Sequence, residues 1–102
     1  YNPATGEVQA HVALADPAEM DHAVRIAAAA QVRWAAVNPQ RRARVLMRLV
    51  DLLNRDMDKL AEALSREHGK TLPDAAGDVQ RGLEVVEYCI GAPQLLKGEF
   101  TD

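Results

Sequence analysis

Residues 67–88 have the sequence Glu-His-Gly-Lys-Thr-Leu-Pro-Asp-Ala-Ala-Gly-Asp-Val-Gln-Arg-Gly-Leu-Glu-Val-Val-Glu-Tyr. This stretch predicts the end of one helix, a turn and the start of another. Gly69 suits the left-handed position after a helix, and Pro73 suits a first helical turn. Two more glycines, Gly77 and Gly82, fall inside the second helix, where each costs about 1 kcal/mol relative to alanine. This cost indicates that something outside the helix approaches it closely.

The helix that follows Pro73 has two chemically different faces. Its apolar positions have the spacing of a face packed against a core, and they are Val79, Leu83, Val86 and Ile90. The other face consists of Asp74, Gly77, Arg81, Glu84 and Tyr88. Because a guanidinium is a planar fork suited to a carboxylate, Arg81 is the candidate binding residue of the chain. The alternative is an ordinary surface ion pair of Arg81 with Glu84 or Glu87.

Three more helices are predicted before this stretch. Asp16-Pro17-Ala18-Glu19 combines a capping residue, a first-turn proline and a capping-box glutamate, and its helix should continue to about Val37. Asn38-Pro39 starts a second helix, and Asp56 is expected to cap a third. The apolar stripes of these helices are Met20, Ala23, Val24, Ala27, Ala30 and Trp34; Val45, Leu46, Leu49, Leu52 and Leu53; and Met57, Leu60, Ala61 and Leu64.

The N-terminal residues are expected to form an arm. Residues 1–6 contain proline and glycine and predict a turn, and residues 7–13 alternate apolar and polar side chains as a half-buried strand does. The strand would need a hydrogen-bonded partner, and no second strand is evident. The expected fold class is therefore mostly α, with one N-terminal strand and about four helices. The chain is interpreted as a single segment, 1–102, with a strand/turn arm at 1–15, helices at 16–93 and an irregular tail at 94–102.

Composition predicts a thin core and excludes two classes of partner. The chain has 102 residues and is 48% hydrophobic, but much of that share is alanine and only 4% of the residues are aromatic. Such a chain can bury little apolar volume by itself. Its net charge of −3 argues against a nucleic-acid partner. No apolar run approaches the roughly 18 residues of a membrane span, so no membrane partner is expected.

No catalytic, metal or cofactor site is predicted within the chain. Cys89 is interpreted as a buried structural thiol, because no histidine lies near it in the sequence to activate it. The three histidines lie on separate elements without metal-ligand spacing. The glycines match neither the dinucleotide fingerprint nor the P-loop. Four arginines between Arg41 and Arg48 are interpreted as a solvated helix face.

Several motifs resemble those of one family. The opening Asn2-Pro3-Ala4-Thr5-Gly6-Glu7 resembles the signature of the aldehyde dehydrogenase superfamily, and Glu67-His68-Gly69-Lys70 fits the same order. Residues 69–87, which include Arg81, and residues 91–99 resemble the CoA-acylating methylmalonate-semialdehyde dehydrogenases. The resemblance covers essentially the whole chain. Its opening motif is superfamily-wide, whereas the segment around Arg81 is much more selective.

This resemblance implies an N-terminal helical layer beside the NAD-binding domain of an α/β enzyme. In such enzymes a cysteine thiolate attacks the aldehyde, NAD accepts a hydride and CoA accepts the acyl group, with decarboxylation. None of the matching positions is the nucleophile or the NAD fingerprint, so the fragment alone is expected to be inactive and to bind neither NAD nor CoA. By the same resemblance, Arg81 binds the carboxylate of methylmalonate or malonate semialdehyde.

The resemblance also implies partners and a location. The partners would be the rest of the parent chain and further copies of the same enzyme in a homo-oligomer that serves valine catabolism. A bacterial cytoplasmic location is expected, with the mitochondrial matrix as the alternative. A second hypothesis is a stand-alone helical interaction module without enzymatic activity. The gene sequence beyond Asp102 would distinguish the two hypotheses.

Overall fold

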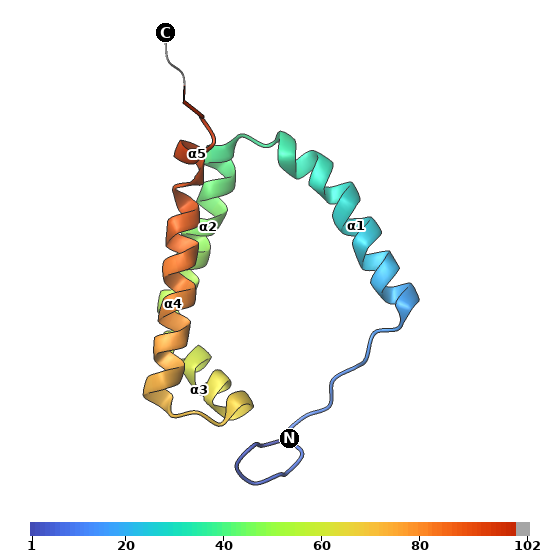
Figure 1. Ribbon diagram of the computed structural model, residues 1–102, viewed down its shortest axis with the longest axis vertical. Coiled ribbons are helices and arrows are strands. Elements are labelled where there is room, and N and C mark those ends of the chain that lie inside the picture. Colours follow the sequence, from blue (N-terminus) through green and yellow to red (C-terminus); the bar gives the residue numbers. More distant parts are fainter. Residues whose placement is uncertain (100–102) are drawn as a thin grey trace.

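The computed structural model describes residues 1–99 and contains five helices within that range. They are α1 (Pro17–Ala36), α2 (Pro39–Arg55), α3 (Met57–His68), α4 (Leu72–Ile90) and the short α5 (Ala92–Leu95), as Figure 1 shows. The tail that was expected to be irregular from residue 94 therefore includes the end of α5. Its last three positions, 100–102, lie outside the described residues.

Local signals account for α1. The Asp16 carboxylate accepts a hydrogen bond from the Glu19 N–H at 2.8 Å, and the Glu19 carboxylate accepts one from the Asp16 N–H at 2.9 Å. The predicted capping box is thus confirmed. The alanine-rich sequence that follows has a high helix propensity. Within residues 1–99, α1 contains no buried residue and packs against none of the other helices.

Helices α2, α3 and α4 form the packed part of the molecule, here called the α2–α4 unit (39–90), in which α4 lies against both α2 and α3. Among the described residues, the buried apolar side chains are Ala43, Ala61, Ala75 and Leu83. Alanine lets two helices approach closely but removes little apolar surface from water. The prediction of a thin core is therefore confirmed.

The turn between α3 and α4 forms as the sequence indicates. Gly69 adopts φ +81° after α3, and the Thr71 hydroxyl accepts a hydrogen bond at the start of α4. A Cβ atom at Gly69 would lie 2.7 Å from Cγ of Pro3, so the N-terminal loop lies directly against this turn. The side chain of Gln9 also donates a hydrogen bond to the carbonyl oxygen of Arg66 at 3.3 Å. The arm therefore contacts the C-terminal end of α3.

The prediction of an N-terminal strand is wrong. The turn at residues 1–6 does form, closed by a 2.8 Å hydrogen bond from the Gly6 N–H to the Asn2 carbonyl. Residues 7–13, however, are irregular, and no strand occurs within residues 1–99. The apolar side chains of the arm are exposed, Val12 by 84% and Leu14 by 92%. A strand requires a neighbouring strand to pair its backbone groups, and the described chain supplies none.

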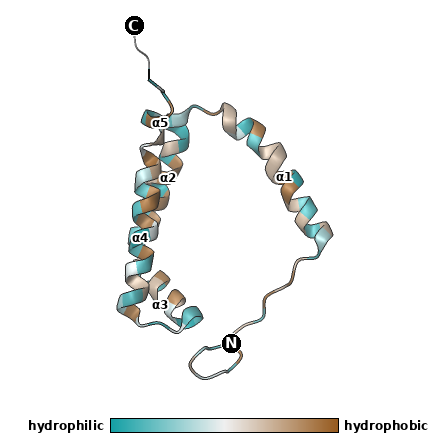
Figure 2. Ribbon diagram, in the orientation of Figure 1, coloured by the Kyte–Doolittle hydropathy of each residue, from teal (hydrophilic) through white to brown (hydrophobic). Residues whose placement is uncertain are grey.

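The described part of the molecule is open rather than compact. Its Cα radius of gyration is 18.7 Å, whereas a compact domain of about 100 residues would have about 13 Å. Figure 1 shows α1 joined to the start of α2 by residues 37–38, with the N-terminal end of α1 leading away from the α2–α4 unit. Figure 2 shows hydrophobic residues along both α1 and the α2–α4 unit. The apolar stripe of α1 is not a core within this chain, since Met20 and Val24 are each 59% exposed.

Candidate functional site

Arg81 lies on the free side of α4. Its side chain is 72% exposed, whereas Leu83, two residues later, is buried. Two residues correspond to about 200° around a helix, so the two side chains leave α4 on nearly opposite sides. Tyr88 is exposed as well. The predicted division of α4 into a packed face and a free face is therefore confirmed at Leu83 and Arg81.

Within residues 1–99, the ion-pair partner of Arg81 is Asp78, and neither Glu84 nor Glu87 pairs with it. Nη2 of Arg81 donates to Oδ1 of Asp78, one turn earlier on α4. Glu84 instead accepts a hydrogen bond from Gln80 at 3.2 Å. The spacing of three residues between Asp78 and Arg81 is readable in the sequence, and it is the signal that identifies this pair.

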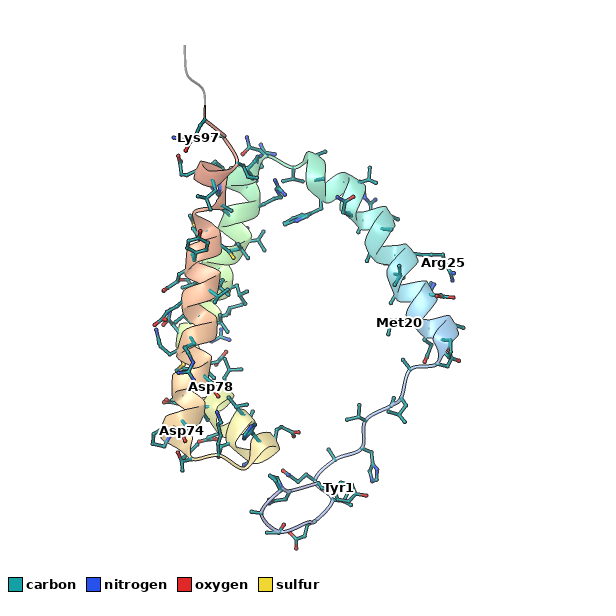
Figure 3. The ribbon with its side chains drawn as sticks, viewed as in Figure 1. Tyr1, Met20, Arg25, Asp74, Asp78 and Lys97 are labelled. Atoms are coloured by element: carbon teal, nitrogen blue, oxygen red, sulfur yellow. The ribbon has the colours of Figure 1, made fainter. Side chains whose placement is uncertain are left out.

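Asp78 binds a second cation. Nζ of Lys70 donates to Oδ2 of Asp78, so the two carboxylate oxygens have different partners. The hydrogen bond from Lys70, followed by that from Arg81, lowers the pKa of Asp78 below its ordinary value. Figure 3 shows Asp78 on the half of α4 nearest the α3–α4 turn. These three residues are here called the Lys70–Asp78–Arg81 cluster.

The α3–α4 turn fixes the lysine of this cluster. Gly69 ends α3 in the left-handed conformation, and Oγ of Ser65 donates to the carbonyl oxygen of Lys70 at 2.8 Å. The side chain of Lys70 is 20% exposed, against 72% for Arg81. The cluster thus consists of an inner lysine, a shared carboxylate and an outer arginine that faces solvent.

Open space lies beside Arg81. Apart from its chain neighbours and the backbone of its own helix, a Cβ atom added at Gly77 would meet no atom of the described residues within 4 Å, whereas Gly82 lies on the apolar groove lined by Leu49, Leu53 and Leu60. Within residues 1–99, Arg81 donates a hydrogen bond only through Nη2, so its remaining N–H groups are available to a ligand. The prediction that another group approaches α4 at these glycines stays a prediction. Chemically, the site is suited to bind a planar anion such as a carboxylate.

A cavity of about 260 Å³ lies at the other end of the α2–α4 unit. Its lining residues are Trp34, Pro39, Arg42, Ala43, Leu46, Cys89, Ala92, Pro93 and Leu96. Cys89 is exposed although it lines this cavity, so its interpretation as a buried thiol is wrong for the described chain. Arg42 is half-buried and its Nε has no hydrogen-bond partner among the described residues, whereas Arg41, Arg44 and Arg48 are exposed as expected.

Within residues 1–99, no group of three or more histidine, cysteine, aspartate or glutamate residues lies where it could hold a metal ion. None of the described helices is both long enough and apolar enough to span a bilayer.

Asp56 differs from its expected role. It occupies the N-cap position of α3, but its side chain makes no capping hydrogen bond. Its carboxylate instead accepts hydrogen bonds from Arg55 and Lys59. These bonds lower the pKa of Asp56 to about 2. Asp56 is thus a second aspartate that bridges two cations, at the junction of α2 and α3.

Comparisons with known proteins agree with the resemblance seen in the sequence. The chain is 45% identical over 101 residues to malonate-semialdehyde dehydrogenase of Pseudomonas aeruginosa, an alignment that covers 99% of this chain and 20% of that protein. It is 47% identical over 98 residues to malonate-semialdehyde dehydrogenase of Listeria monocytogenes, covering 96% and 20%. The chain therefore spans about one fifth of the length of these relatives.

A solved structure provides the same comparison in three dimensions. It is a crystal structure described as that of a methylmalonate-semialdehyde dehydrogenase from Sinorhizobium meliloti complexed with NAD. The match has a TM-score of 0.93 and 64% sequence identity, and it covers 100% of this chain and 21% of that one. The profile of the aldehyde dehydrogenase family matches residues 1–102. The chain belongs to the aldehyde dehydrogenase family.

Proposed function

We propose that this chain is the N-terminal part of a CoA-acylating, NAD-dependent methylmalonate- or malonate-semialdehyde dehydrogenase. The observation that carries the proposal is the TM-score of 0.93 at 64% identity over the whole chain to a structure described as a methylmalonate-semialdehyde dehydrogenase complexed with NAD. A relative from Caenorhabditis elegans, 50% identical over 98 residues, is named as an acylating enzyme for both semialdehydes.

In this proposal, catalysis belongs to the rest of the parent protein. When bound there, NAD would accept the hydride and CoA would accept the acyl group. The products would be propionyl-CoA or acetyl-CoA. The residues described here offer no fit to a dinucleotide, because their glycines do not form the phosphate-binding fingerprint. This chain would instead provide one wall of the substrate site.

Arg81 is the residue that we assign to the substrate. Methylmalonate and malonate semialdehyde carry a carboxylate beside the aldehyde, so a selective site needs a fixed cation. Arg81 is exposed, is held by Asp78 through one nitrogen, and lies one turn from Gly77, where an added Cβ would meet open space. The remaining N–H groups of its guanidinium can bind a carboxylate in the bidentate geometry that arginine favours.

Kinetics of the full-length parent enzyme test this assignment. Arg81→Ala and Arg81→Lys should raise KM for methylmalonate semialdehyde by about 10- to 100-fold, because alanine removes the ion pair with the substrate and lysine removes its bidentate geometry. KM for propionaldehyde, which has no carboxylate, should change little. Equal losses on both substrates would contradict a role in carboxylate recognition.

We further propose that the parent enzyme works in the cytoplasm as a homo-oligomer, without nucleic-acid or membrane partners. The net charge of −3 supports the absence of a nucleic-acid partner, and the exposed apolar residues of α1, which include Met20 and Val24, support packing against another part of the assembly. Some relatives are bacterial, and two carry the word mitochondrial in their names, so organelle fractionation is the relevant test in a eukaryotic host. Sedimentation of the parent enzyme would measure its oligomeric state.

A further inference from the structure

The Lys70–Asp78–Arg81 cluster joins residues from two elements around one carboxylate. Arg81 and Asp78 are neighbours on α4, whereas Lys70 comes from the turn that precedes the helix. Each oxygen of Asp78 accepts a hydrogen bond from a different cation. The Asp78 carboxylate therefore connects the guanidinium of Arg81 to Lys70 in the α3–α4 turn.

The net charge of this cluster distinguishes it from a simple ion pair. An isolated Asp–Arg pair is neutral and would attract a further carboxylate only weakly. With Lys70 included, two positive groups share one negative group, so the cluster keeps a net charge of about +1. Arg81 can consequently be held in place by Asp78 and still attract an anion.

The anchoring of the cluster decreases from its inner to its outer member. The Lys70 carbonyl accepts a hydrogen bond from Ser65, and the Lys70 side chain is 20% exposed. The Arg81 side chain is 72% exposed and has several rotatable bonds, so an ordered guanidinium depends on the contact with Asp78. Ordering before the ligand binds reduces the entropy lost on binding.

We propose that Asp78, held by Lys70, is a positioning residue that fixes the guanidinium of Arg81 for a substrate carboxylate. This inference rests on the proposed function, since it requires that Arg81 binds that carboxylate. It predicts that Asp78, although negatively charged, increases the affinity of the site for an anion. Removing the negative aspartate makes the site more positive, yet it should weaken the binding of an anion.

Steady-state kinetics of the full-length enzyme test whether Asp78 raises or lowers its affinity for the semialdehyde. Asp78→Ala should raise KM for methylmalonate semialdehyde by about ten-fold, with kcat and KM for propionaldehyde within about two-fold of wild type. Asp78→Asn keeps one acceptor oxygen for Arg81 but places an NH2 donor against Lys70, so it should restore only part of the affinity. An unchanged or lowered KM for the semialdehyde in Asp78→Ala would overturn the proposal. Equal rises for both substrates would also overturn it, because they indicate a purely structural role.

The matched control is Asp56→Ala. Asp56 bridges Arg55 and Lys59 as Asp78 bridges Lys70 and Arg81, but it lies at the junction of α2 and α3. Its substitution should leave the ratio of the two KM values unchanged. A shift of that ratio equal to the shift in Asp78→Ala would overturn the proposal, since any lost ion pair would then have the same effect.

A double-mutant cycle separates this inference from the proposed function. Once Arg81 is alanine, the further change Asp78→Ala should have no effect on KM for the semialdehyde, because the group that it positions is gone. If Arg81→Ala leaves the ratio of KM values unchanged, the proposed function itself fails. If Arg81→Ala is selective and Asp78→Ala is not, only the positioning role fails.

Discussion

Helix α1 and the α2–α4 unit are both helical, but different interactions maintain them. Helix α1 has 20 residues, a complete capping box and no buried residue. The α2–α4 unit contains all four buried apolar side chains of the described residues, Leu83 among them. Local hydrogen bonds and helix propensity hold α1, whereas contacts between helices hold the α2–α4 unit. The same residue types thus form helices with and without tertiary support.

The largest expected effect is a loss of stability that should be much larger for a substitution in the α2–α4 unit than for one in α1. Leu83→Ala should lower the free energy of unfolding of this chain by about 2–5 kcal/mol, because it removes the largest side chain of the thin core. Val24→Ala on α1 should change it by less than about 0.5 kcal/mol, since Val24 is exposed and alanine favours helices. Urea unfolding followed by circular dichroism measures both values. Similar losses in the two variants would show that α1 is packed in solution.

The contrast explains which predictions from the sequence succeed. The capping box at Asp16 and the left-handed Gly69 depend on neighbouring residues, and both are confirmed. The strand at residues 7–13 depends on a partner from elsewhere, and alternation within one segment carries no information about that partner. The prediction fails for this reason.

The candidate site shows the same limit. Arg81 was predicted as a candidate from its residue type and helical face, and the structure places it on the free side of α4. The spacing of Asp78 and Arg81 could have been recognised, because i, i+3 pairs are local. The contact of Lys70 with Asp78 spans eight residues and a turn, so it depends on the direction in which the chain leaves α3.

The second prediction concerns the point where the arm meets the α2–α4 unit. Gly69→Ala should destabilise the chain by about 1–2 kcal/mol, because a left-handed backbone is unfavourable for alanine and its Cβ would lie 2.7 Å from Pro3. Gly77→Ala is the matched control in a right-handed helix with open space around it. It should stabilise the isolated chain by about 0.5–1 kcal/mol.

The arm contact can be separated from the backbone strain at Gly69. In a Pro3→Ala background, the urea-measured cost of Gly69→Ala should shrink but not disappear, since only the clash with the proline ring is removed. An unchanged cost would mean that the arm does not lie against the turn in solution.

The third prediction compares two helix caps. Asp16→Ala should remove about 1 kcal/mol from α1, and the loss should appear as faster amide hydrogen exchange within Pro17–Ala36 with little change in the urea midpoint. Thr71→Ala removes a cap of α4, a helix that packs against α2 and α3, so it should move the midpoint. A shift of the midpoint in Asp16→Ala would indicate that α1 and the α2–α4 unit unfold together.

The smallest effect is electrostatic and belongs to the α2–α4 unit. Hydrogen bonds from Arg55 and Lys59 lower the pKa of Asp56 to about 2, whereas an unfolded aspartate titrates near 4. The folded state therefore gains stability from this carboxylate above about pH 4, and it loses that gain as the pH falls towards 2.

The urea midpoint of the wild type should fall between about pH 4 and pH 2, and that of Asp56→Asn should fall less. Because the pair is solvated, 1 M salt should reduce the difference between the two proteins. A difference that survives salt would show that the short-range hydrogen bonds from Arg55 and Lys59, rather than the screened attraction between charges, supply the stability.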